Sequence, residues 1–421
     1  MTAEARQEYT SEFLRLGPRT NGVLRSPTRR GPEASVGVIA MHPTSDFHNH
    51  LSGSELAARG FRTLCTNGRF VNQPEDRVIT EELPLDVKHA VAYMRQQPGI
   101  DKVALVGHSG GGELMALYQH LAEKGPGAGQ GPGKLVQATD ELSGLPPADG
   151  LILLDAHPGG NRATYLDPAV RDEAHPELRD SSLDMYDPSN GYDPEGANYS
   201  EDFKRRFYQA QGERMNRLVG AALDRRAVID AGRGSYPDTE PFAVARVGAR
   251  MLQADLSQVR RTKNAYPVLK ADGSQVVEVP QSVRLPSANR EHNLSYSEGV
   301  VTYTVHSFLS WGALRAKADY CVTEDAIEGL GWDTTNVSTV ANIPGIESPT
   351  LIMAMGAHYF IVPSEMYYTL SPSSDKTMVV VEGATHGFQP CKPSERFPGQ
   401  FGDTVKTTFD YVGGWLRERF L

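Results

Sequence analysis

Residues 102–112 read KVALVGHSGGG, and this stretch indicates how the chain folds. Residues 103–106 are four aliphatic side chains in a row, as expected of a short strand that is buried on both faces of a parallel sheet. Glycines then flank Ser109, and a helical pattern follows over residues 112–124. The stretch therefore predicts a strand, a sharp turn that carries Ser109, and a helix.

Similar aliphatic runs lie on both sides of this stretch and alternate with helical patterns. The alternation predicts the α/β class, with a mostly parallel sheet and helices on both of its faces. Strands are expected over 35–42, 61–66, 102–108, 150–156, 349–356 and 376–383, and helices over 54–60, 83–97, 112–124 and 403–420.

The alternation stops after residue 158 and resumes near residue 346. We therefore expect an α/β core made of residues 1–158 and 346–421, interrupted by a cap or lid over 159–345. Within the cap the pattern predicts a helical segment over 200–229, a hairpin over 266–280 and a helix over 302–317. The Gly/Pro-rich run 125–134 is expected to form a flexible surface insertion.

Composition narrows the class of partner. The chain has 421 residues with 52 acidic and 42 basic side chains, so its formal charge of -10 disfavours nucleic acid. No apolar run approaches the roughly 18 to 20 residues that span a bilayer, and the N-terminus lacks the pattern of a signal peptide, so we expect a cytoplasmic protein without a membrane partner. The three scattered cysteines, Cys65, Cys321 and Cys391, fit neither a disulfide framework nor a paired-cysteine zinc site.

Ser109 is the candidate nucleophile. A turn this tight raises the serine hydroxyl above the end of the sheet, and Gly107 and Gly111 allow strand and helix to pass closely. The N–H of Gly110 is expected at the positive end of the helix, where it would stabilise an oxyanion.

On these residues the chain resembles the α/β-hydrolase fold superfamily, over most of residues 35–158 and 345–421. The resemblance implies a catalytic histidine in the loop after the last strand, where His386 lies in the sequence EGATHGF. It also implies a second oxyanion donor in the loop after the third strand. That loop reads HPTS from residue 42, and because Pro43 has no N–H, the expected donor is Thr44.

The acidic partner of His386 departs from the pattern. In the segment 356–363, GAHYFIVP, Tyr359 stands where relatives often carry an aspartate, and a phenol with a pKa of about 10 cannot replace a carboxylate. Two alternatives remain open: Asp155, at the end of the strand 151–154, and Glu365, two residues after Pro363. Glu382 is a weaker third candidate.

These residues predict a serine hydrolase that cleaves a carboxylic ester or lactone of a small molecule through an acyl-enzyme, with no cofactor. Asp46, His48 and His50 cluster in the sequence, but they lack further ligands and we expect no metal. Thioester, amide or carbon–carbon bond cleavage are alternative reactions of the same residues. A non-catalytic binding protein on a hydrolase scaffold is the alternative that Tyr359 favours.

Overall fold

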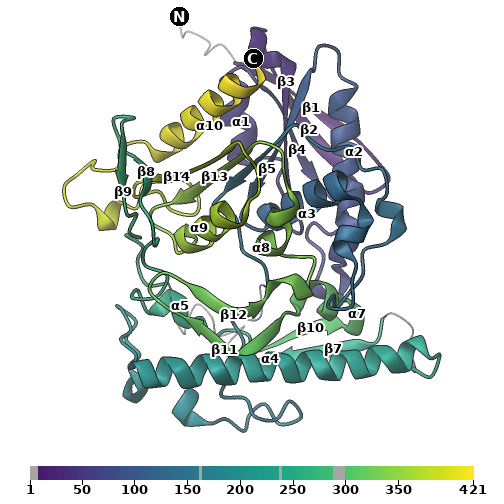
Figure 1. Cartoon of the computed structure of the whole chain (residues 1–421), viewed down its shortest axis with the longest axis vertical. Coiled ribbons are helices and arrows are strands. Elements are labelled where there is room, and N and C mark those ends of the chain that lie inside the picture. The colour runs from purple at the N-terminus through teal and green to yellow at the C-terminus, as the bar shows by residue number, and fades with distance from the viewer. Residues whose placement is uncertain (1–7, 161–163, 237–238, 288–298) are drawn as a thin grey trace, which may run out of the picture.

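The computed structural model describes residues 8–160, 164–236, 239–287 and 299–421. A large sheet with its helices fills the upper part of the view in Figure 1, and the long helix α4 (Glu201–Asp230) runs along the lower edge. The upper part contains both the beginning and the end of the described chain. The α/β class predicted from the sequence is therefore confirmed.

The main sheet has ten strands, and the central ones are parallel. Strand β3 lies between β4 and β5, so the chain leaves β3 and β5 toward opposite sides. At such a reversal, the carboxyl ends of the two strands are where α/β proteins bind ligands. In spatial order the strands are β1 (Tyr9–Arg15), β2 (Asn21–Pro27), β4 (Arg62–Asn67), β3 (Val36–His42), β5 (Lys102–His108), β6 (Gly150–Leu154), β13 (Thr350–Met355), β14 (Lys376–Val381), β8 (Tyr266–Leu269) and β9 (Gln275–Glu278).

Helices cover both faces of this sheet because alternate strand residues point to opposite sides. Ile39 and Met41 of β3 belong to the core under one set of helices, and Val38 and Ala40 belong to the core under the other. The first set is α2 (Leu83–Arg95), α3 (Gly110–Lys124), α8 (Thr339–Asn342) and α9 (Ile361–Leu370), and the second set is α1 (Leu51–Ala58) and α10 (Thr404–Phe420).

The boundaries of the predicted cap need correction. The expected hairpin forms as β8 and β9, with Gly273 at φ +83° in its turn, but it lies in the main sheet and not in a separate cap. Strand β8 runs parallel to β14, with Val268 opposite Val380. Part of the range 159–345 therefore extends the core sheet.

The long helix α4 and the elements that pack on it form a separate layer below the sheet in Figure 1, whereas α8, near the end of that range, belongs to the core. Helix α4 begins as predicted, because the Ser200 hydroxyl accepts a hydrogen bond from the N–H of Phe203. The fully buried Arg214 of α4 donates to the carbonyls of Asp167 and Ala245 and so ties the layer together. The other elements are β7 (Pro241–Ala245) paired with β10 (Val300–Thr304), β11 (Arg315–Val322) paired with β12 (Ile327–Gly331), and the short helices α5 (Met251–Ala254) and α7 (Val305–Ser307).

Two further predictions differ from the structure. The helix expected over 302–317 is only a short helical segment between β10 and β11, because the β-branched start of this range pairs with β7 instead. The run 125–134 is ordered: Gln137 bonds both the N–H and the carbonyl of Gly131. None of the described helices combines the length and apolar character needed to cross a bilayer.

Candidate active site

Ser109 occupies the sharp turn between β5 and α3. Its backbone has φ +56° and ψ −129°, a conformation that is strained for any residue with a side chain. The turn needs glycine on both sides: a Cβ on Gly107 would lie 2.6 Å from the carbonyl oxygen of Gly111, and one on Gly111 would lie 2.6 Å from that of Met41. The carbonyl of Ser109 is held by the N–H of His157, at 2.9 Å.

The loop after β14 brings His386 to this turn. His386 Nε2 lies 3.0 Å from Ser109 Oγ, which is hydrogen-bond distance. The carbonyl of His386 is 2.8 Å from His108 Nε2, so the strand that leads to Ser109 also fixes the histidine loop. Gly383, at φ +63°, turns the chain out of the strand toward this position.

Asp155 completes the arrangement from the end of β6. Its side chain is fully buried, and its Oδ2 lies 2.6 Å from His386 Nδ1. Its Oδ1 accepts the backbone N–H of Met355 at 3.1 Å. Burial alone would raise the pKa of this carboxyl, but His358 and His386 outweigh burial and hold the pKa well below its usual value. Asp155 is therefore an ionised acceptor for the Nδ1–H of His386.

A second histidine, His358, also approaches Asp155. Its Nδ1 lies 2.8 Å from the same Oδ2, and its ring centroid is 4.5 Å from that of His386. No sequence motif pointed to His358, although it lies one position before Tyr359 in the loop expected to carry the acid. One ligand atom from each of Asp155, His358 and His386 lies within 4.8 Å of the others, so these three side chains are also a possible ligand set for a transition metal.

Tyr359 turns away from His386 and contacts the cap. Its hydroxyl accepts from Gln253 Nε2 at 2.9 Å and lies 3.4 Å from the hydroxyl of Tyr165. Burial and the Tyr165 hydroxyl raise the pKa of Tyr359 well above its usual value, so the phenol remains protonated. The cap therefore reaches the residue next to His358.

The structure does not bring Glu365 to His386. Glu365 lies on α9, which directs the buried carboxylate toward the segment before β8. There it accepts the backbone N–H groups of Lys263 (2.7 Å) and Asn264 (2.9 Å) and the hydroxyl of Tyr266 (3.2 Å). Glu382 likewise pairs with another residue, Lys270, at 3.0 Å.

The expected oxyanion donors also need revision. Gly110 is the first residue of α3, and the first N–H groups of a helix have no acceptor within it. The N–H of Thr44, however, donates to His42 Nδ1 at 3.1 Å, and the N–H of Ser45 donates to the same atom at 2.9 Å. The turn after β3 therefore uses its own N–H groups, and Thr44 is not free to bind a substrate oxygen.

The histidines of the loop 46–50 have separate partners. His48 Nε2 lies 2.6 Å from Asn21 Oδ1, whereas His50 Nε2 lies 3.0 Å from His108 Nδ1. His50 also caps α1 by accepting the N–H of Ser52. Burial, followed by the neighbouring His386, lowers the pKa of His50 to about 4. The ring nitrogens of His48 and His50 thus face different partners.

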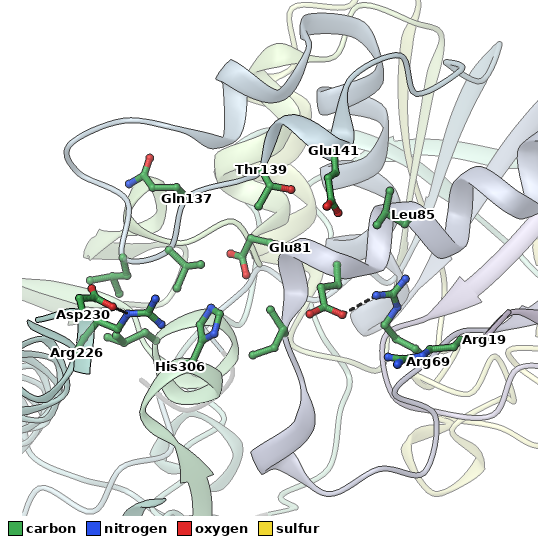
Figure 2. A pocket seen from close by; sticks show the side chains of 15 residues that line it. Arg19, Arg69, Glu81, Leu85, Gln137, Thr139, Glu141, Arg226, Asp230 and His306 are labelled. Atoms are coloured by element: carbon green, nitrogen blue, oxygen red, sulfur yellow. Dashed lines mark hydrogen bonds and ion pairs between the residues drawn. The ribbon is translucent and has the colours of Figure 1, made fainter. Parts of the chain in front are cut away.

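A cavity of about 810 Å³ lies elsewhere, between the core and the cap (Figure 2). Two of its basic groups have acidic partners, Arg69 with Glu82 and Arg226 with Asp230, and Arg19 lines the cavity as well. The buried Glu81 faces it and accepts hydrogen bonds from Ser310 and Asn336. None of the residues around Ser109 lines this cavity.

No protein-family model matches the chain, and no curated protein sequence matches it. Solved structures align over nearly all of it at low identity. DcsB in complex with a substrate analogue is 11% identical, over 98% of this chain and 99% of that one, with a TM-score of 0.46. Proline iminopeptidase from Mycobacterium smegmatis is 15% identical, over 97% and 98%, with a TM-score of 0.41. A hypothetical protein from Pseudomonas aeruginosa is 12% identical, over 100% and 96%, with a TM-score of 0.40. These scores are low, so the fold rests on the strand order and on the turn at Ser109.

Proposed function

We propose that this chain, which has the α/β-hydrolase fold, is a serine hydrolase that cleaves a carboxylic ester or lactone of a small molecule. The observation that supports the proposal is the chain of two hydrogen bonds from Ser109 Oγ through His386 to Asp155, at 3.0 and 2.6 Å. The order Ser, Asp, His along the sequence is the order of this fold's hydrolases.

The first half of the reaction acylates Ser109. His386 Nε2 takes the hydroxyl proton as Oγ bonds to the substrate carbonyl carbon, and the carbonyl electron pair moves to its oxygen. The ionised Asp155 stabilises the imidazolium that results. When the carbonyl re-forms, the bond to the alcohol breaks, and His386 returns the proton to the departing oxygen.

The second half releases the acid. Water loses a proton to His386 Nε2 as it attacks the acyl carbon, and the proton then returns to Ser109 Oγ. The N–H of Gly110 stabilises the oxyanion in both halves. None of these steps requires a cofactor.

The position of the cap favours a small-molecule substrate. Through Gln253 and Tyr165 it contacts Tyr359, which adjoins His358 and so lies close to the hydrogen-bonded triad. A cap this close to the nucleophile favours a compact ligand over a polymer.

Hydrolysis of p-nitrophenyl esters and of a chromogenic lactone tests the proposal. The wild-type protein should turn over at least one of them, and Ser109→Ala should lower kcat by roughly 10⁴-fold or more. Thioester and anilide analogues, assayed in parallel, measure the alternative bond types. If the wild-type protein and Ser109→Ala are equally inactive on every substrate, yet bind the same ligands, the protein is a binding protein and the proposal is wrong.

A further inference from the structure

His42 lies beside the turn that carries Ser109. It is the last residue of β3, and β3 runs parallel to β5, which ends one residue before Ser109. The backbones meet here, because a Cβ on Gly111 would lie 2.6 Å from the carbonyl oxygen of Met41. The end of β3 therefore lies against the turn that carries Ser109.

The surroundings of His42 fix which ring nitrogen carries the proton. Its Nδ1 accepts the N–H groups of Thr44 (3.1 Å) and Ser45 (2.9 Å), so in the neutral ring the proton is on Nε2. Burial, followed by the charges of His50 and other neighbouring histidines, lowers the pKa of His42 to about 3. The ring also packs on Phe47, at 5.2 Å between centroids. His42 is thus a neutral, oriented N–H donor at physiological pH.

That donor faces Gly110. A Cβ on Gly110 would lie 2.8 Å from His42 Nε2. Since a Cβ is about 2.5 Å from the nitrogen of its own residue, His42 Nε2 lies within about 5.3 Å of Gly110 N. Two donors that share one oxygen at about 3 Å each stand no more than about 6 Å apart. Within the described part of the chain, Nε2 has no hydrogen-bond partner of its own.

We infer that His42 Nε2–H is the second donor of the oxyanion hole and acts together with the N–H of Gly110. The inference rests on the proposed function and adds a catalytic residue to it. As Ser109 Oγ bonds to the acyl carbon, the carbonyl electron pair moves to the oxygen, and both N–H groups bind that charge without giving up their protons. The His42 side chain thereby donates the hydrogen bond to the oxyanion that a backbone N–H at position 43 or 44 would otherwise donate. A proline, which has no N–H, is therefore tolerated at position 43.

Two substitutions test the acceptor Nδ1 and the donor Nε2 of His42 separately. His42→Asn keeps an acceptor where Nδ1 lies, for the N–H groups of Thr44 and Ser45, but removes the donor. His42→Gln reaches the Nε2 position with an amide N–H. On p-nitrophenyl esters, His42→Asn should lower kcat by about 10²- to 10³-fold with KM within about threefold, and His42→Gln should recover at least about tenfold of that loss.

The loss in His42→Asn should also be the same from pH 6 to pH 8.5, because a neutral donor does not titrate there. His48→Asn, in the same loop but bonded to Asn21, is the matched control and should retain wild-type kcat and KM. A kcat of His42→Asn within threefold of wild type, or a loss that His42→Gln does not relieve, would overturn the inference.

Failure of this inference differs from failure of the proposed function. If the wild-type protein hydrolyses no ester, the function itself is wrong; if it does and His42→Asn matches it, only the role of His42 is wrong. Should His42→Asn not fold, Gly110→Ala is the second variant. Its Cβ displaces the His42 ring while the N–H of residue 110 remains, so kcat should fall by about tenfold or more, and a wild-type kcat would reject the donor.

Discussion

Asp155 and Glu365 are both buried carboxylates, but their surroundings differ. Asp155 ends a strand and faces the imidazoles of His386 and His358, at 2.6 and 2.8 Å. Glu365 lies within a helix and faces the backbone N–H groups of a neighbouring segment. Under the proposed function, Asp155 is the acidic member of the triad, whereas Glu365 holds the neighbouring segment in place.

The largest effect that follows from this contrast concerns Asp155→Asn. The amide cannot stabilise the imidazolium and can favour the wrong tautomer of His386, so kcat should fall by about 10³- to 10⁴-fold. Steady-state kinetics on a p-nitrophenyl ester measures the loss, with Glu365→Gln as the matched control. If Glu365→Gln showed the large loss of kcat and Asp155→Asn did not, Glu365 and not Asp155 would be the acidic partner of His386.

The second effect is on stability in acid, because several partly buried histidines of low pKa interact with His386. His50 binds a proton less readily in the native protein, where its pKa is about 4, than in the unfolded chain, where it is about 6.5. The contribution of neutral His50 to the free energy of unfolding is complete above about pH 6.5 and is lost as the pH falls toward about 4. This loss is worth roughly 3 kcal/mol.

His50→Asn removes this titration and keeps a side chain that caps α1. Urea unfolding at pH 7 and at pH 4.5 should therefore show a smaller drop in unfolding free energy for His50→Asn than for the wild-type protein. His48→Asn serves as the control. An equal drop in His50→Asn and wild type would show that His50 is not a buried neutral group.

The third effect concerns Glu365 itself. In Glu365→Gln an amide NH₂ replaces one oxygen, and one of the N–H groups of Lys263 or Asn264 loses its acceptor. We expect an unfolding free energy lower by about 1 to 3 kcal/mol, with kcat within threefold of wild type. Thermal unfolding combined with the ester assay measures both. If Glu365→Gln were as stable as the wild-type protein, the hydrogen bonds of Glu365 to Lys263 and Asn264 would not stabilise the fold.

The smallest effect is that of His358. It lies beside the acid without touching Ser109, so it is a positioning residue that keeps Asp155 ionised and in place. His358→Asn should lower kcat by about tenfold with KM unchanged, and should shift the acid limb of the kcat profile. An unchanged rate and an unchanged pH profile would assign His358 to packing alone.

The core of the fold was predictable because its central strands are uninterrupted aliphatic runs. The segments of β1 and β2 were not recognised, since an edge hairpin with mostly exposed residues in β1 has no such run. The cap was harder: β11 and β12 pair within one local hairpin, but β7 and β10 do not. The pairing of β7 with β10 joins segments more than fifty residues apart, which no local pattern records.

The sequence motif identified Ser109 and His386, but it left the acid undecided between Asp155 and Glu365. The choice depends on the direction in which each side chain leaves its element, and only the folded chain supplies that. The roles of His42 and His358 depend on what each ring nitrogen faces, and Thr44 was chosen without knowing that its N–H already had an acceptor.

Labelling with a fluorophosphonate, followed by mass spectrometry, reports directly on the reactivity of Ser109. We expect one phosphonate per wild-type chain, attached to the peptide that contains Ser109. Ser109→Ala should carry no label, Asp155→Asn should be labelled more slowly, and Glu365→Gln should be labelled like the wild-type protein. A wild-type protein that stays unlabelled, or equal labelling of Ser109→Ala, would contradict the role of Ser109 as the nucleophile.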